Sequence, residues 1–190
     1  IIPVVAIQSA ADAVPLANAL IAGGINVIEI TLRTDAALES IQNIAREVPQ
    51  MNIAAGTVLN PDHYQQAIDA GAKLIISPEI TQNLLLKGQD NSVPLLPGVS
   101  SASELMLIIE LGYSRCKFFP ATAAGSHAML KALKGPFEHI KFCPTGGITL
   151  DNAQSFLSLT NVICVGGSWL SPIELVKEKR WEDITKIAKD

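Results

Sequence analysis

The chain has 190 residues, of which 48% are hydrophobic and 17% are charged. This composition excludes a disordered chain, and the length allows a buried core without disulfides or a structural metal. The 14 Lys and Arg residues and 18 Asp and Glu residues give a net charge of -4, and no basic run stands out. The charge therefore argues against nucleic acid as a partner.

Three cysteines lie in the C-terminal half, at Cys116, Cys143 and Cys164, without a CxxC pair or a cluster with histidine. This odd number argues against both a disulfide framework and a structural zinc. No apolar stretch reaches about 18 residues, and the first residues lack the basic and apolar segments of a signal peptide. We therefore expect a cytoplasmic protein without a membrane partner.

Short runs rich in β-branched residues alternate with segments of helical periodicity. The expected strands are 3–7, 27–31, 52–55, 73–77, 93–96, 116–119, 140–143 and 162–165. The clearest helices are 11–22, 36–48, 61–70, 101–111 and 127–133. Eight units in this order predict one α/β domain over residues 1–190, a (β/α)₈ barrel of the TIM type. A doubly wound open sheet built from the same units is the alternative.

Glycine and proline mark the boundaries of these units. The segments 22–24 and 70–72 place glycine where a helix ends in the left-handed conformation. Small or polar residues followed by proline or glycine end several strands, as in 75–79 and 117–121. In a barrel, the loops after the strands carry the active site.

Glu29 lies within the expected second strand, where Ile28 and Ile30 point to the opposite face. Glu29 shares its face with Thr31 and Arg33. A carboxyl group held away from water is suited to proton transfer. An ion pair with a neighbouring cation inside the barrel, or a strand at an exposed edge, is the structural alternative.

Lys117 lies in the expected sixth strand and shares a face with Phe119, opposite to Cys116 and Phe118. Burial disfavours the ammonium form of lysine, and the free amine is a nucleophile that attacks carbonyls. The alternative is a lysine that extends from the strand end to water, with its charge paired to an acid.

Two glycine pairs come near the ends of the last two expected strands. They read Thr145-Gly146-Gly147 and Gly166-Gly167-Ser168. Glycine lets backbone N–H groups approach an anion closely, and loops at these positions form the recurrent phosphate site of barrels. Two pairs, each with a hydroxyl beside it, predict a phosphate cradle. Plain tight turns are the alternative.

Thr57 follows the expected third strand, where its hydroxyl is placed to donate to a carboxylate or to cap the next helix. His63, His127 and His139 have no partner at metal-ligand spacing. We therefore expect no metal site.

This ordered set of residues resembles the class I aldolases of 2-keto-3-deoxy-6-phosphogluconate (KDPG) and 4-hydroxy-2-oxoglutarate (KHG). The resemblance covers nearly the whole chain. The segments that carry it are 3–7, 22–34, 54–61, 95–107, 117–121, 135–137, 142–149 and 165–170. It is more specific than any one motif because the segments occur in the same order.

The resemblance implies a barrel that forms a homotrimer and needs no cofactor. It implies that Lys117 forms a Schiff base with pyruvate and that Glu29 moves protons. The further roles that it implies are Arg33 and Thr57 for the pyruvate carboxylate, Pro78 at the mouth, Phe119 over the imine, Thr145 at the substrate hydroxyls, and Gly146, Gly147, Gly167 and Ser168 at the phosphate. KDPG cleavage in the Entner–Doudoroff route is the function that it favours, and KHG cleavage is the alternative.

Three positions depart from the family pattern. Glu79 stands where glycine is common, Thr122 replaces a glutamate, and segment 123–128 replaces a more glycine-rich loop. The resemblance also implies a helix before the first strand, ahead of Ile1. Glu79 and Thr122 keep open a non-catalytic phosphosugar-binding barrel, and a sugar-phosphate isomerase or epimerase is a third alternative.

Overall fold

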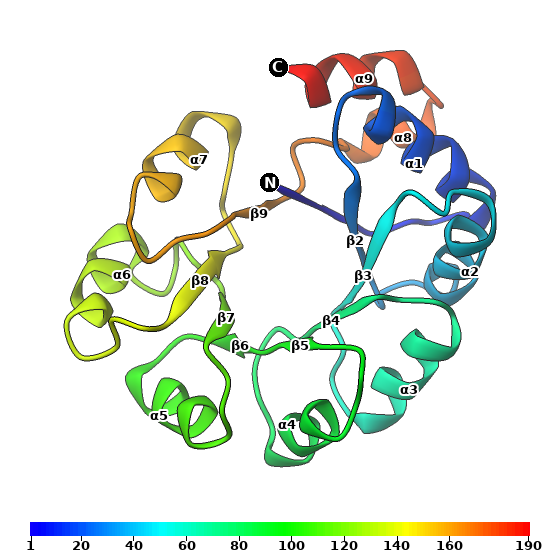
Figure 1. Cartoon of the computed structure of the whole chain (residues 1–190). Coiled ribbons are helices and arrows are strands. Elements are labelled where there is room, and N and C mark those ends of the chain that lie inside the picture. Colours follow the sequence, from blue (N-terminus) through cyan, green and yellow to red (C-terminus); the bar gives the residue numbers. More distant parts are fainter.

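The strands form the inner ring of the molecule and the helices form its outer layer, as Figure 1 shows. The computed structural model describes every residue from Ile1 to Asp190. The strands are β1 (Ile2–Val5), β2 (Val27–Thr31), β3 (Asn52–Gly56), β4 (Leu74–Ile76), β5 (Leu95–Leu96), β6 (Gly98–Val99), β7 (Arg115–Phe118), β8 (Lys141–Pro144) and β9 (Gly166–Gly167). The helices are η1 (Ala10–Asp12), α1 (Ala13–Ala22), α2 (Ala37–Glu47), α3 (Pro61–Asp69), α4 (Gln82–Gln89), α5 (Ala102–Glu110), α6 (Ser126–Lys134), α7 (Leu150–Leu157), α8 (Ile173–Lys177) and α9 (Trp181–Lys189).

The strands pair in parallel around the ring. One sheet runs in the order β5-β4-β3-β2-β1-β9 and the other in the order β6-β7-β8. β5 and β6 are consecutive and are separated by Pro97, which has no N–H to donate to a ladder. Isolated bridges from Phe142 to Val162 and from Thr145 to Gly166 join the two sheets on the other side. With β5 and β6 counted as one position, the ring has the eight units of a (β/α)₈ barrel, so the prediction is confirmed and the open-sheet alternative is wrong.

The position of the last expected strand, 162–165, is wrong. Residues 162–165 form a bridge only at Val162, and the paired strand is β9, which begins at Gly166. Two residues of β8 separate Phe142 from Thr145, whereas three separate Val162 from Gly166. The extra residue interrupts the regular ladder, as in a β-bulge.

The turns between helices and strands follow the expected glycine chemistry. Gly24 and Gly71 have φ angles of 90° and 103°, which confirms the left-handed ends predicted for these helices. Asn60 is the N-cap of α3, because its side chain accepts a hydrogen bond of 2.8 Å from the backbone N–H of His63. Thr57 is therefore not the cap of this helix, and that alternative is wrong.

The hydrophobic core lies between the ring and the helices. It is a cluster of 42 buried residues, to which β2 contributes Ile28 and Ile30, both fully buried. α9 packs against α1, where the hydroxyl of Thr185 donates a 2.9 Å hydrogen bond to the carbonyl of Ala19. No helix is long and apolar enough to cross a membrane. The core fixes the outer face of each strand and leaves the inner face to the polar side chains of the site.

Candidate active site

A buried ion pair lies inside the barrel. The Nζ atom of Lys117 on β7 is 3.0 Å from Oε1 of Glu29 on β2, and the two side chains are 6% and 2% exposed. The face assignments from the sequence are therefore confirmed for both residues. Burial of either charge alone is costly, and pairing compensates much of that cost. The contact also places a proton donor and a proton acceptor within hydrogen-bond distance of each other.

The structure decides between the alternatives for these two residues. Glu29 forms the ion pair with a cation inside the barrel, whereas the exposed-edge alternative is wrong because β2 pairs with both β1 and β3. Lys117 is paired to an acid, but it does not extend to water. A pair of this kind is compatible with catalysis, since a proton can pass between the amine and the carboxylate along the same contact.

Glycine on the next strand makes room for the carboxylate. A Cβ atom at Gly56 on β3 would collide with the side chain of Glu29. Sequence reasoning did not assign this residue a role, although a glycine inside a strand is a signal of close approach. Gly98 on β6 has a comparable position, because a Cβ atom there would collide with the carbonyl of Pro78.

Thr31 holds Arg33 at the end of β2. The hydroxyl of Thr31 donates a 2.9 Å hydrogen bond to the carbonyl of Val5 and accepts one of 3.1 Å from Nε of Arg33. Arg33 itself is exposed, so its terminal nitrogens are available to an anion at the barrel mouth. Thr31 is a positioning residue, whose role the sequence did not reveal.

The two glycine pairs meet at one cavity of about 180 Å³. Its lining residues include Arg33, Phe119, Thr145, Gly146, Gly147, Gly166, Gly167 and Ser168. Gly146 and Gly147 have φ angles of 100° and 74°, so the first pair is also a tight turn that requires glycine. The second pair forms β9, where a Cβ atom at Gly167 would collide with the Trp169 ring. The first pair is therefore a tight turn, as the alternative predicts, and the phosphate role of both pairs stays a prediction.

The remaining site residues lie elsewhere around the mouth. Thr57 and Pro78 follow β3 and β4 and do not line this cavity. Lys117 and Glu29 lie deeper in the barrel, and the Phe119 ring joins the two levels, with its centroid 5.4 Å from Nζ of Lys117. The arrangement thus combines a buried lysine and glutamate with a glycine-lined cavity near the surface, which we call the cradle.

Comparison with known protein families identifies the family of this chain. The sequence model described as KDPG and KHG aldolase matches residues 1–187. The chain belongs to the KDPG and KHG aldolase family. This confirms the resemblance read from the ordered motifs.

Full-length similarity supports the same family. The chain is 51% identical over 189 residues to a 2-dehydro-3-deoxy-phosphogluconate aldolase from Pseudoalteromonas atlantica, covering 100% of this chain and 88% of that protein. It is 45% identical over 190 residues to the KHG/KDPG aldolase of Escherichia coli K12, covering 100% and 89%.

Solved structures agree in fold as well as in sequence. A KDPG aldolase from Legionella pneumophila, with pyruvate captured as a covalent carbinolamine, superposes with a TM-score of 0.98 at 48% identity, covering 99% of this chain and 91% of that one. A Zymomonas mobilis KDPG aldolase with 3-phosphoglycerate gives 0.92 at 44% identity, covering 99% and 88%. The family therefore includes an enzyme for which the covalent attachment of pyruvate has been observed.

One departure from the family pattern places a second acid at the rim of the aldolase mouth. Glu79 follows β4, and burial together with the charge of Glu104 raises the pKa of its carboxyl. Burial alone raises the pKa of Glu104, but hydrogen bonds donated by Ser100 and Ser101 outweigh it and lower that pKa. Backbone N–H groups of both serines lie 2.8 Å from Oε2 of Glu104. The pair thus consists of one carboxylate that is stabilised by protein hydrogen bonds and one poorly solvated carboxyl.

The second departure supports the cradle of this aldolase directly. Thr122 is exposed, and its hydroxyl donates a 3.2 Å hydrogen bond to the carbonyl of Gly146. A Cβ atom at Gly147 would collide with the Thr122 side chain. Thr122 therefore braces the first glycine turn. In the loop 123–128, the Ser126 side chain contacts the ring of His127 at 3.0 Å.

All three cysteines of this family member are free thiols. Hydrogen bonding to Cys164 and burial raise the pKa of Cys143 well above its usual value, and the same hydrogen bond lowers the pKa of Cys164. Burial raises the pKa of Cys116. No group of three or more His, Cys, Asp or Glu residues is placed to hold a metal ion.

Proposed function

We propose that this enzyme, a carbon–carbon lyase, cleaves KDPG to pyruvate and glyceraldehyde 3-phosphate through a Schiff base on Lys117. The observation that carries the proposal is the buried contact of 3.0 Å between Lys117 and Glu29. It joins a nucleophile to its proton acceptor beneath a cavity lined by paired glycines. A barrel that only binds a phosphosugar does not require this pair, and an isomerase requires no imine-forming lysine.

The pair performs the first step by moving a proton from Lys117 to Glu29. The free amine then attacks C2 of the substrate to form a carbinolamine. Glu29 returns its proton to the hydroxyl of this intermediate, which leaves as water, and an iminium remains. The positive nitrogen draws electrons from the C3–C4 bond.

The second step breaks the carbon skeleton. Glu29, directly or through water, takes the proton of the C4 hydroxyl, and the C3–C4 electrons move into the iminium. The products are an aldehyde and a neutral enamine. Glu29 protonates the enamine at C3, and water hydrolyses the resulting pyruvate imine to release Lys117. Phe119 shields the imine from water before that stage.

The mouth residues hold the two ends of the substrate. Arg33, fixed by Thr31, and Thr57 bind the carboxylate of the pyruvate moiety, and Pro78 lines the mouth. The further assignments in this proposal are Thr145 at the substrate hydroxyls and Gly146, Gly147, Gly167 and Ser168 at the phosphate. Backbone N–H groups at such glycines are suited to a phosphate because no side chain blocks their approach.

KHG is the second substrate that we propose, with cleavage to pyruvate and glyoxylate. It uses the same imine chemistry but has no phosphate, so the cradle favours KDPG. The name of the E. coli relative includes both substrates. Comparison of kcat/KM for KDPG and KHG separates the two functions.

We also propose that residues 1–190 act as one domain, within a cytoplasmic homotrimer. The single core cluster supports one domain, and the metabolic relatives support the cytoplasm. The trimer rests on the family resemblance. Sedimentation velocity at micromolar concentration tests it, and a monomer would refute it.

Borohydride reduction in the presence of pyruvate tests the central step. We expect a mass increase from one reduced pyruvate on Lys117, located by peptide mapping, and none in Lys117→Ala. A folded wild-type protein that shows no adduct would refute the Schiff-base mechanism.

A further inference from the structure

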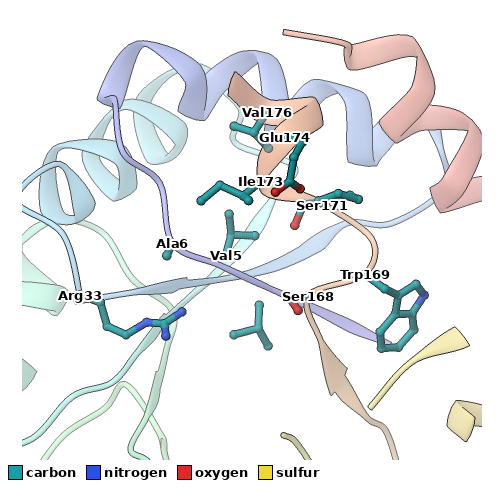
Figure 2. Close-up of a pocket in the computed structure, with 11 residues that line it drawn as sticks. Val5, Ala6, Arg33, Ser168, Trp169, Ser171, Ile173, Glu174 and Val176 are labelled. Carbon is teal, nitrogen blue, oxygen red and sulfur yellow. The ribbon is translucent and has the colours of Figure 1, made fainter. Parts of the chain in front are cut away.

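A second cavity, of about 400 Å³, lies beside the phosphate cradle. Figure 2 shows it between β1, the loop that contains Ser168, and helix α8. Val4, Arg33 and Ser168 line both this cavity and the cradle. The two spaces therefore share an edge, and at this edge Ser168 is the residue that the proposed mechanism places at the distal end of the substrate. We call the second cavity the side cavity.

Ser171 is the polar group that sets the chemistry of the side cavity. The residue is 6% exposed, and its hydroxyl is buried without a hydrogen-bond partner. Figure 2 shows this hydroxyl directed into the cavity rather than toward the protein backbone. Buried hydroxyl groups are nearly always hydrogen-bonded. An unpaired hydroxyl that lines a cavity indicates a ligand that donates or accepts a hydrogen bond there.

The rest of the lining combines apolar walls with one acid, Glu174, and one cation, Arg33. Val5 and Val176 are buried and form part of the apolar surface. Glu174 is exposed, and Figure 2 shows its carboxylate near Ser171. A carboxylate at this position repels a phosphate group of a ligand and accepts hydrogen bonds from its hydroxyl groups. Because Arg33 and Glu174 carry opposite charges, the lining has no net charge, and it fits an uncharged carbon chain with several hydroxyls.

We propose that the side cavity extends the aldehyde side of the active site and takes the neutral, polyhydroxylated chain of an unphosphorylated aldehyde of five carbons. The corresponding cleavage substrate is an unphosphorylated 2-keto-3-deoxy acid of eight carbons. The proposal rests on the proposed aldolase function. A phosphorylated triose ends at the cradle, whereas a longer chain without a phosphate passes Ser168 into the side cavity.

The reaction with such an aldehyde is an aldol addition, which is the reverse of the cleavage reaction. The methylene carbon of the pyruvate enamine on Lys117 forms a bond to the aldehyde carbon. The aldehyde oxygen takes the proton held by Glu29 and becomes a hydroxyl. Hydrolysis of the imine then releases the eight-carbon acid, without any oxidation or reduction.

The test measures kcat/KM for the addition of pyruvate to D-ribose and to glyceraldehyde 3-phosphate. Ser171→Ala removes the hydroxyl, and Ile173→Trp narrows the side cavity from its rim. Ile173 is 42% exposed, so the larger side chain does not disturb the core. Leu86→Trp on α4 is the matched control, because Leu86 is also 42% exposed and lies outside the cavity.

We expect Ser171→Ala and Ile173→Trp each to lower the ratio of the D-ribose to the triose phosphate kcat/KM by about tenfold. The control leaves the ratio unchanged. The small open-chain fraction of D-ribose is the same for every variant and cancels in the comparison.

Two results would overturn the proposal while leaving the aldolase function intact. One is an unchanged ratio in both cavity variants, and the other is a wild-type enzyme that adds triose phosphate but no D-ribose. Absence of the borohydride adduct on Lys117 would instead refute the aldolase function itself. The adduct experiment therefore distinguishes the two failures.

Discussion

The interior of the barrel and the cradle at its mouth hold charge in opposite ways. Inside, Lys117 is held by one carboxylate, that of Glu29, in a place almost without water. At the mouth, Gly146 and Gly147 present backbone in a half-buried turn, and Ser168 is exposed. A buried side-chain pair gives fixed geometry for chemistry, whereas a backbone cradle open to water allows a substrate to enter and leave. Substitutions in the interior and at the cradle separate these two roles.

Loss of the interior amine has the largest expected effect. In Lys117→Ala, turnover of KDPG falls on the order of 10⁴-fold or more. The substitution also leaves Glu29 buried without its partner, which costs about 3–5 kcal/mol in the free energy of unfolding. Steady-state kinetics and urea denaturation measure the two effects.

Lys117→Arg separates chemistry from folding. It keeps a cation opposite Glu29 but cannot form an imine, so we expect a protein that is closer to wild type in stability and still inactive. Substantial activity in Lys117→Arg would contradict the covalent mechanism.

Removal of the interior acid has the next largest effect. Glu29→Gln keeps the size of the side chain but removes the proton acceptor, and we expect kcat to fall by about 10²–10⁴-fold. Because the amine remains, borohydride still traps pyruvate on Lys117, more slowly than in the wild type. An unchanged kcat would show that another group moves the protons.

A change at the cradle affects one substrate and not the other. In Ser168→Ala, we expect kcat/KM for KDPG to fall about tenfold, while the value for KHG stays the same, because only KDPG has a phosphate. The exposed Ser103 on α5 provides the matched serine-to-alanine control. Equal losses for both substrates would argue against a phosphate role for Ser168.

Substitution of the two acids at the rim, Glu79 and Glu104, has the smallest expected effect. It changes the free energy of unfolding, and the change depends on pH. The raised pKa of Glu79 means that its ionisation in the folded state opposes folding. Its favourable contribution is complete below the unfolded pKa and is lost as pH rises through the folded pKa. At a pH above the folded pKa, we expect the free energy of unfolding of Glu79→Gln to exceed that of the wild type by up to about 1 kcal/mol. Below the unfolded pKa, we expect no difference between the two proteins.

Glu104→Gln should show the opposite trend. The lowered pKa of Glu104 stabilises the fold above the unfolded pKa, and this stabilisation is lost as pH falls through the folded pKa. Thermal melting at several pH values measures both variants. Parallel pH profiles for the two would contradict the assigned directions.

The sequence predicted the elements well because strands and helices differ in local periodicity. It also placed Glu29 and Lys117 on inward faces. Their contact could not be read from the sequence, because the two residues are 88 positions apart and meet only when the ring closes. The ends of the last strand were missed for a related reason, since the extra residue among 163–165 has meaning only against β8.

Other parts of the site depend on space rather than on residue type. Gly56 matters because of the carboxylate beside it, and Ser171 because of the cavity that it lines. Glu29 is distant from Gly56 in the sequence, and the cavity at Ser171 is completed by residues of β1 at the other end of the chain. The glycine pairs that line the cradle, by contrast, are recognisable in the sequence because glycine pairs with adjacent hydroxyls are a local signal, and their phosphate role stays a proposal.

β9 both closes the ring and lines the cradle. Its residues Gly166 and Gly167 pair with Ile2 and Pro3 of β1, and Gly166 bridges to Thr145. If the proposed phosphate site is correct, we expect a phosphate bound at this backbone to be coupled to closure of the barrel and to add to the free energy of unfolding. A ligand at 100 times its Kd contributes about 2.7 kcal/mol. The melting temperature thus reports binding of phosphorylated compounds even in a variant that has lost Lys117 and can no longer turn them over.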